Sequence, residues 1–257
     1  MCSEGNGLDR SPPLLSLLCA AALALLLPRG AEAQLEVLLR GVEPTEPRVG
    51  ACGLYRFEAR EPSGERSVEF RACIEEGPER DTVLLHLWSG DSLEARVELA
   101  AEMFSGGGSL LEHVRSVVQI EKGRAQRLEP EDWQELPALS PAPQLPVVAD
   151  SSLGVQRHPG TGLECHGRFL EEARSSTRRM GEVEVTQAEE RRLQIWTAPE
   201  APILGVVSAW AVVRSERRFS QPIPGVPQRG PRVSHYALEL LEYTQNGAPD
   251  HGSSPHD

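Results

Sequence analysis

The chain has 257 residues, of which 25% are charged, and its formal net charge is −12 at pH 7. Nucleic-acid binding depends on lysine and arginine clustered against phosphate, so this acidity argues against nucleic acid as a partner and equally against anionic membrane surfaces. After residue 33, no run approaches the roughly 18 apolar residues of a transmembrane helix, so we expect that this is not an integral membrane protein.

The first 33 residues are typical of a cleavable signal peptide. Residues 14–27 form an apolar run that is too short to span a membrane, and Pro28 and Gly30 end it. Ala31-Glu32-Ala33 supplies the small residues that a signal peptidase requires, which places the cut before Gln34. We therefore expect an exported protein, periplasmic or extracellular. The chain after the predicted cleavage has a net charge of −11 instead of −12, because the signal peptide carries two cations and three acids.

The rest of the chain divides by composition. Residues 34–49 are a lead-in, and residues 50–245 read as a single β-domain in which strand-like runs are separated by turn residues. Residues 128–162 contain six prolines, which predicts a long connection crossing one end of a sheet, with a hinge between two subdomains as the alternative. Residues 246–257 form a polar tail that we expect to be disordered.

Period-two alternation is clear near the start of the β-domain. Tyr55 and Phe57 alternate with polar positions, and after a turn at residues 62–65 the apolar set continues with Val68 and Phe70. In an antiparallel hairpin, the residue numbers of each pair sum to the same constant. Because one apolar set is odd-numbered and the other even-numbered, this constant must be odd. We predict a constant of 127, with Ser63-Gly64 as the two-residue turn.

Three cysteines follow the predicted cleavage site: Cys52, Cys73 and Cys165. The predicted register places Cys52 and Cys73 diagonally on one face, about 7–8 Å apart. The usual disulfide range between Cα atoms is about 4.4–6.8 Å, so a Cys52–Cys73 bond requires a bulge near Cys52. The alternative is that both are free thiols.

Further strands are expected along both halves of the β-domain. Residues 81–89 are apolar on both faces, as in a central strand, and residues 92–100 alternate cleanly, with Leu93 and Val97 on the apolar face. Residues 171–179 are highly charged and predict a short helix or a polar loop, while residues 219–231 predict a loop. The remaining strands are expected at residues 117–121, 163–170, 181–186, 191–196, 206–215 and 233–243. About ten strands at near-regular spacing predict an all-β, mainly antiparallel fold: a curved sheet or half-barrel.

Three patches carry a resemblance to a known group. They are Val49-Gly50-Ala51-Cys52-Gly53-Leu54-Tyr55, then Pro159-Gly160-Thr161-Gly162-Leu163-Glu164-Cys165, and finally Ile195-Trp196 with the turn that follows and the closing Leu240-Leu241-Glu242-Tyr243. In order and spacing the chain resembles exported bacterial proteins of unknown function that form an open β half-barrel, similar to periplasmic lipoprotein carriers. The group has tryptophan where this chain has Cys52. The resemblance implies a sheltered concave face and supplies no catalytic residues.

No motif predicts catalysis, a metal site or a cofactor. Cys165 and His166 are neighbours in a predicted strand, so their side chains point to opposite faces and cannot share a proton. His158 could reach Cys165 from the preceding loop, but no oxyanion-hole motif accompanies the two. The seven histidines form no His-x-x-x-His pair. A local basic cluster predicts a solvated loop, or else a contact for an anionic head group or an acidic partner: Arg214, Arg217, Arg218, Arg229 and Arg232.

These observations favour a non-catalytic, exported binding protein that holds a lipid or another apolar small molecule on the concave sheet face. Strand parity predicts the side chains on that face: Tyr55, Phe57, Val68, Phe70, Leu93 and Val97. The alternative is a structural or protein-interaction module of the cell envelope whose interior is plugged by its own side chains. An enzyme is the least supported interpretation.

Overall fold

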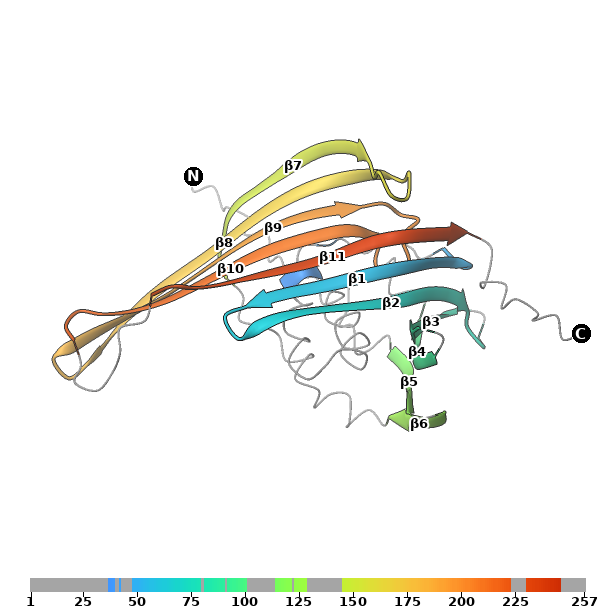
Figure 1. Cartoon of the computed structure of the whole chain (residues 1–257), viewed down its shortest axis with the longest axis horizontal. Helices are drawn as coiled ribbons and strands as arrows, with labels where there is room; N and C mark the ends of the chain where they lie inside the picture. The colour runs from blue at the N-terminus through green and yellow to red at the C-terminus, as the bar shows by residue number, and fades with distance from the viewer. Residues whose placement is uncertain are drawn as a thin grey trace, which may run out of the picture.

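The computed structural model describes residues 37–39, 42, 48–79, 81–90, 92–100, 114–121, 123–128, 145–222 and 230–245. Its strands form one open, curved sheet in the order β6-β5-β4-β3-β2-β1-β11-β10-β9-β8-β7, and every neighbouring pair is antiparallel (Figure 1). This confirms the predicted all-β, mainly antiparallel curved sheet. Within the described ranges, no helix combines the length and the apolar character needed to cross a bilayer.

The eleven strands cover most of the described chain. The first six are β1 (Ala51–Glu61), β2 (Gly64–Glu76), β3 (Thr82–Ser89), β4 (Ser92–Ala100), β5 (Val114–Glu121) and β6 (Arg124–Leu128). The other five are β7 (Val147–Arg157), β8 (Glu164–Met180), β9 (Val183–Thr197), β10 (Val206–Phe219) and β11 (Arg232–Gln245). The first and the last strand, β1 and β11, pair with each other in the middle of the sheet and join its two halves.

The β1–β2 hairpin has the predicted faces but not the predicted register. Glu61 pairs with Gly64, so the turn is Pro62-Ser63 and the paired residues sum to 125 rather than 127. Arg56 lies opposite Glu69, and their side chains form an ion pair at 2.7 Å between Nη2 and Oε1. The predicted register would have set Arg56 against Arg71, and like charges directly opposite each other destabilise a sheet. The prediction was therefore wrong by two residues.

The corrected register places Cys52 directly opposite Cys73, and the two form a disulfide with a Cα–Cα distance of 4.1 Å. No bulge interrupts the β1–β2 ladder at this point. Cys165 is a free, buried thiol. The bond therefore closes the open end of the hairpin, at the end opposite its turn.

Replacing both Cys52 and Cys73 by alanine is expected to lower the free energy of unfolding by about 3 kcal/mol, because a cross-link across this separation restricts the unfolded chain. Urea denaturation of the variant and of the wild type measures the difference. Treating the wild type with a reductant should produce the same loss and should leave the double variant unaffected. A loss below about 1 kcal/mol would contradict the entropic account.

Several strands lie where the sequence predicted other structure. The proline-rich range 128–162 contains β7, which starts directly after Pro146 and is an edge strand, where missing N–H groups are tolerated. Residues 171–179 are neither helix nor loop but part of β8, and residues 183–197 form one strand where two were predicted. A further short strand, β6, was missed. The predicted signal peptide and the C-terminal tail lie outside the described residues.

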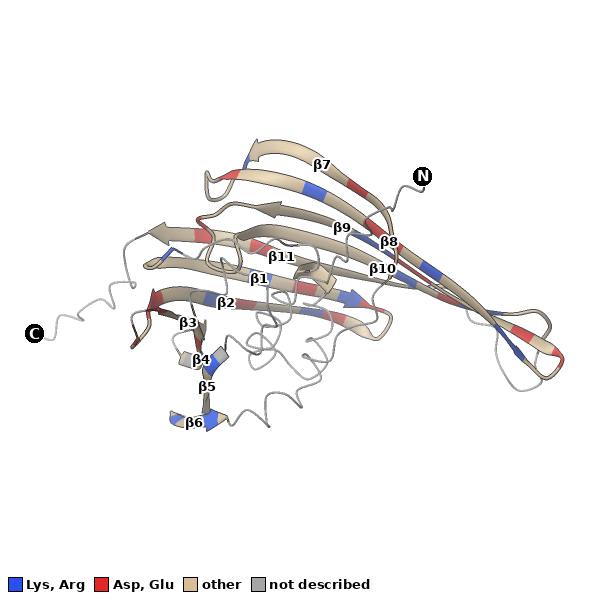
Figure 2. Cartoon of the chain, turned by 180° about the vertical axis from the view of Figure 1, so that it is seen from behind, with Lys and Arg blue, Asp and Glu red and all other residues tan. Residues whose placement is uncertain are grey.

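The sheet extends into a long arm on one side (Figure 1). The arm consists of β8 beyond Glu172, β9 before Arg191, β10 beyond Val213 and β11 before Ser234. Residues 174–180 of β8 are exposed, and Figure 2 shows both signs of charge distributed along the arm. The arm is therefore held by its ladders and by cross-strand contacts such as that between the hydroxyls of Thr177 and Thr186, 2.9 Å apart.

One face of the sheet carries the hydrophobic core, and we call it the inner face. Cross-strand pairing places Tyr55, Phe70 and Leu240 side by side, and next to them Phe57, Val68 and Leu238. Tyr55, Phe57 and Phe70 are at most 1% exposed. The opposite, outer face carries the charged alternates, including the Arg56–Glu69 pair.

Candidate functional site

The residues predicted to line a ligand site belong to the inner face. Tyr55, Phe57, Phe70 and Val97 are buried in one core cluster, and Val68 is partly buried against it. The rings of Tyr55 and Phe70 are stacked, with centroids 5.7 Å apart. The side chain of Leu93 lies outside the described residues.

Residues outside the sheet cover part of this face. The turn between β9 and β10, residues 198–205, folds against it, and Ile203 is fully buried there. The hydroxyl of Tyr55 anchors the turn: it donates to the carbonyl of Val206 at 3.1 Å and accepts from the N–H of Ile203 at 3.2 Å. Leu38 and Leu39, in the helical residues 37–39, are also fully buried in the same cluster. The inner face is thus packed beneath segments that do not belong to the sheet.

Along β8 to β11 the inner face changes from apolar to polar in successive cross-strand rows. One row consists of Leu170, Leu193, Ala211 and Tyr236. The next row toward the arm consists of Glu172, Arg191, Val213 and Ser234, and the row after that of Arg174, Glu189, Ser215 and Arg232. Successive residues on one face lie about 6.6–6.8 Å apart along a strand, so the apolar and the charged rows are about 13 Å apart.

A buried charge pair occupies the intermediate row. The side chains of Glu172 and Arg191 are only 3% and 5% exposed, with Oε2 and Nη1 3.9 Å apart. Arg191 also donates from Nη2 and Nε to Oε1 of Glu189, at 2.7 and 2.9 Å. Arg191 therefore connects the buried row to the row of the arm.

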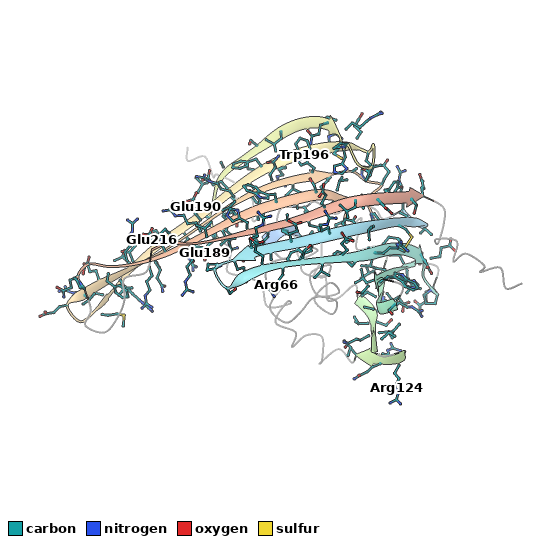
Figure 3. The ribbon with its side chains drawn as sticks, in the orientation of Figure 1. Arg66, Arg124, Glu189, Glu190, Trp196 and Glu216 are labelled. Carbon is teal, nitrogen blue, oxygen red and sulfur yellow. A yellow bond between two sulfur atoms is a disulfide. The ribbon has the colours of Figure 1, made fainter. Side chains whose placement is uncertain are left out.

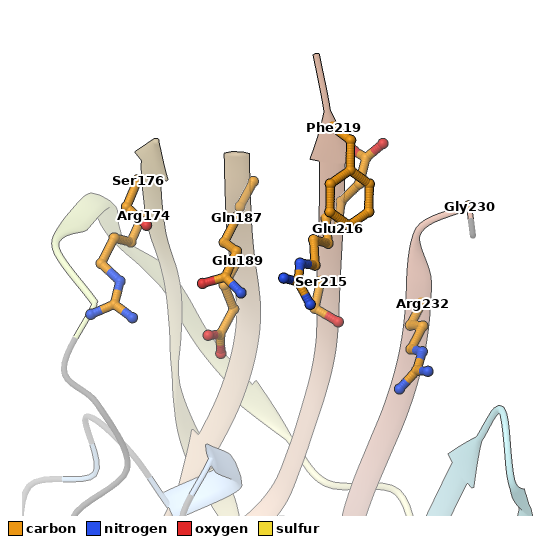
Figure 4. Close-up of a pocket in the computed structure, with 11 residues that line it drawn as sticks. Arg174, Ser176, Gln187, Glu189, Ser215, Glu216, Phe219, Gly230 and Arg232 are labelled. Atoms are coloured by element: carbon orange, nitrogen blue, oxygen red, sulfur yellow. The ribbon is translucent and has the colours of Figure 1, made fainter. Parts of the chain in front are cut away.

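A cleft of about 600 Å³ lies at the base of the arm (Figure 4). Its described lining comes from β8, β9, β10, the start of β11 and Gly230 just before it: Arg174, Ser176, Gln187, Ala188, Glu189, Ser215, Glu216, Arg217, Phe219, Gly230 and Arg232. Figure 3 shows Glu189 and Glu216 where the arm leaves the body of the sheet. Most of this lining is polar, unlike the apolar part of the inner face that was predicted to bind a ligand.

Both carboxylates of the cleft already have arginine partners. Glu189 is bound by Arg191, and Glu216 accepts hydrogen bonds from Nε and Nη2 of Arg218 at 2.6 and 2.9 Å. The hydrogen bond from Arg218 lowers the pKa of the Glu216 carboxyl below its ordinary value. Both side chains therefore already accept hydrogen bonds from arginines, Glu189 from Arg191 and Glu216 from Arg218.

The sequence identified part of this cleft. Two arginines of the predicted basic cluster, Arg217 and Arg232, line the cleft. Arg214 and Arg218 alternate with Arg217 along β10 and so lie on the other face. Arg229 lies outside the described residues. Arg174 was missed because its segment was predicted to be a helix or a loop. In a strand, residues two apart lie on the same face, so a strand over 171–179 would have placed Arg174 on the same face as Glu172.

The structure gives Cys165 no side-chain base among the described residues. Burial raises the pKa of its thiol above the ordinary value, which disfavours the thiolate that nucleophilic chemistry requires. Nδ1 of His158 instead lies 3.1 Å from the hydroxyl of Thr161 and accepts from the N–H of Thr161 at 3.3 Å. These contacts belong to a mostly exposed turn, in which the N–H of Gly162 also bonds to the carbonyl of His158.

Tyr236 on the inner face is expected to make the stability of the fold depend on pH in the alkaline range. Its hydroxyl donates to Oε1 of Glu61 at 3.0 Å, and burial raises its pKa from 10.0 to about 12. The folded state therefore keeps this proton where the unfolded state loses it. The stabilisation is complete below pH 10 and is lost as the pH rises toward 12.

We expect the free energy of unfolding to fall by up to about 2–3 kcal/mol between pH 10 and pH 12 through Tyr236 alone. Urea denaturation across this range measures the fall. The Tyr236→Phe variant supplies the control, because its stability should change less over the same range. Equal pH dependence in the two proteins would refute the assignment.

Comparison with known proteins finds no matching family model and no matching curated protein. The chain matches several solved structures, among them the following two. One is an outer membrane lipoprotein-sorting protein domain from Vibrio parahaemolyticus, 7% identical over 78% of this chain and 87% of that chain, with a TM-score of 0.26. The other is a DUF1329 family protein from Desulfovibrio piger, 12% identical over 95% of this chain and 96% of that chain, with a TM-score of 0.23. The proposals that follow rest on residues of this chain.

Proposed function

We propose that this is an exported, non-catalytic binding protein of the cell envelope that holds a lipid chain or a similar apolar ligand against its inner face. The observation that carries the proposal is the continuous apolar surface that runs across one open sheet, from Phe70 on β2 to Leu193 on β9. The residues predicted to contact the ligand remain Tyr55, Phe57, Val68, Phe70, Leu93 and Val97.

The nature of the cover supports this proposal. In a β-sandwich a second sheet closes the core, and its ladders resist opening. Here the described cover consists of residues 37–39, Val42 and the turn 198–205, which pack on the inner face through side chains such as Leu38 and Ile203. An apolar chain can enter between such segments and the sheet without breaking a ladder.

Native mass spectrometry of the exported protein, purified without detergent, tests the proposal. We expect a reproducible extra mass that is lost on denaturation and matches an apolar small molecule. A photoactivatable, uncharged fatty alcohol then locates the site: adducts should map to inner-face residues such as Phe57, and residues such as Glu58 on the outer face of the same strand serve as the internal control. An apo mass together with adducts spread over both faces would overturn the proposal.

A second candidate, a protein-interaction module, is favoured by the free edge of the sheet. β7 is the last strand, and four of its apolar side chains are exposed: Val147 (58%), Val148 (64%), Leu153 (40%) and Val155 (56%). An exposed apolar edge strand is a template for pairing with another chain. If this candidate is right, sedimentation should reveal self-association that the Val148→Lys, Val155→Lys double variant abolishes, and no ligand mass should be found.

A further inference from the structure

We infer that the cleft at the base of the arm binds an oxyanion and that, given the proposed function on which this step rests, the oxyanion is the head group of the bound lipid. The inference extends the ligand from a plain apolar chain to an amphipathic, anionic molecule. Its evidence is independent of the apolar face, because it comes from the charges and the register of the arm.

Three arginines surround the cleft. Arg174 on β8 and Arg232 on β11 end the same cross-strand row, with Glu189 and Ser215 between them (Figure 4). Arg217 lies on the same face of β10, one row nearer the tip of the arm, opposite Gln187. In the described part of the chain, none of these three side chains forms an ion pair, so each guanidinium is available to a ligand.

The balance of charge in the cleft favours an anion. Its lining holds three arginines and two glutamates, which gives a net charge of +1. Both glutamates are bound by other arginines, Arg191 and Arg218, so neither competes for the three lining arginines. This local excess of cations stands out in a chain whose formal net charge is −12.

The chemistry of the lining suits phosphate or carboxylate oxygens. A guanidinium presents a rigid fork of N–H donors that matches such oxyanions in a bidentate way. Arg217 lies over the ring of Phe219, 5.1 Å from its centroid, and this packing restricts the side chain. The hydroxyls of Ser176 and Ser215 and the amide of Gln187 add neutral donors to the same cleft.

The position of the cleft relates the anion to the apolar face. The arginine row and the row that contains Leu170 and Leu193 lie on one face, about 13 Å apart along the strands. A lipid whose head group is bound by Arg174 and Arg232 can therefore direct its chain along β8 and β9 toward the core. A free oxyanion would use the same donors without reaching the apolar rows.

Titration calorimetry with short-chain, monomeric probes tests the inference on the mature chain. The probes are dihexanoyl phosphatidic acid, the uncharged dihexanoylglycerol, and inorganic phosphate. The cleft variant carries Arg174→Gln, Arg217→Gln and Arg232→Gln, and a charge-matched control carries Arg124→Gln, Arg157→Gln and Arg214→Gln, which are exposed arginines outside the cleft. All six side chains are exposed, so both variants should fold, and circular dichroism verifies this.

We expect the wild type and the control to bind the phosphatidic acid at least about tenfold more tightly than dihexanoylglycerol, with a preference that weakens in salt. The cleft variant should lose this preference and keep the affinity for dihexanoylglycerol. If the cleft variant keeps the preference, the inference is wrong while the lipid-binding function stands. If phosphate binds in a cleft-dependent way but neither lipid binds, the cleft takes a free oxyanion and the lipid-binding function is wrong. If neither anion binds the wild type, the inference is overturned.

Discussion

Replacing Arg191 by methionine is expected to lower the free energy of unfolding by about 3–5 kcal/mol. The side chain is 95% buried and lies between two carboxylates, those of Glu189 and Glu172. Methionine fills a similar volume but removes the cation that faces the buried Glu172 carboxylate. Separating a buried charge from its counter-ion costs more than an ion pair contributes, because the remaining charge stays out of water.

The neighbouring residue provides the matched control for this prediction. Arg192 also lies close to two carboxylates, Glu171 at 3.1 Å and Glu190 at 2.7 Å, but its side chain is 55% exposed on the outer face. Arg192→Met should therefore cost about 1 kcal/mol or less. Urea denaturation compares the two variants, and a Glu172→Leu, Arg191→Met double variant should recover most of the loss. Equal losses at positions 191 and 192 would contradict the assignment of inner and outer faces along β9.

The β1–β2 hairpin illustrates which part of the fold was predictable from the sequence. Apolar alternation determines which side chains share a face, so Tyr55, Phe57, Val68 and Phe70 were placed together correctly. Parity cannot separate a pairing constant of 125 from one of 127, because both leave the same residues buried. Charge pairing across the strands does separate them, since only 125 sets Arg56 against Glu69.

The edge strand β7 and the outer part of β8 were missed for a different physical reason. Both segments are largely exposed on both faces, so neither shows the alternation that half-burial imposes. β7 is held by its ladder with β8, and the outer part of β8 by its ladder with β9. Such strands depend on partners that are distant in sequence, and local composition does not reveal them.

The same reason explains why the cleft was not predicted as a site. Its arginines are separated in sequence by β9 and by the loop before β11, and only the four-strand register brings Arg174 and Arg232 onto one row. The cluster read from the sequence combined residues of both faces, such as Arg217 and Arg218. Knowledge that residues 171–179 form a strand would have added Arg174, and knowledge that β10 continues to Phe219 would have separated Arg217 from Arg218.

Phe57→Ala is expected to lower the free energy of unfolding of the ligand-free protein by about 3–5 kcal/mol, through lost burial and the cavity that remains. Phe57 is 1% exposed and pairs with Val68 on one side and Leu238 on the other. Glu58→Ala, on the outer face of the same strand, should change stability by no more than about 0.5 kcal/mol.

This pair of variants also examines the face on which the proposed ligand would lie. If the inner face is packed beneath residues 37–39 and the turn 198–205, Phe57 stabilises the protein without any ligand, and an apolar chain has to displace part of that cover. If Phe57→Ala costs less than about 1 kcal/mol in the delipidated protein but more in the protein as purified, the ligand itself completes the core. Urea denaturation before and after delipidation therefore separates a closed core, which a ligand opens, from an open face that a ligand fills.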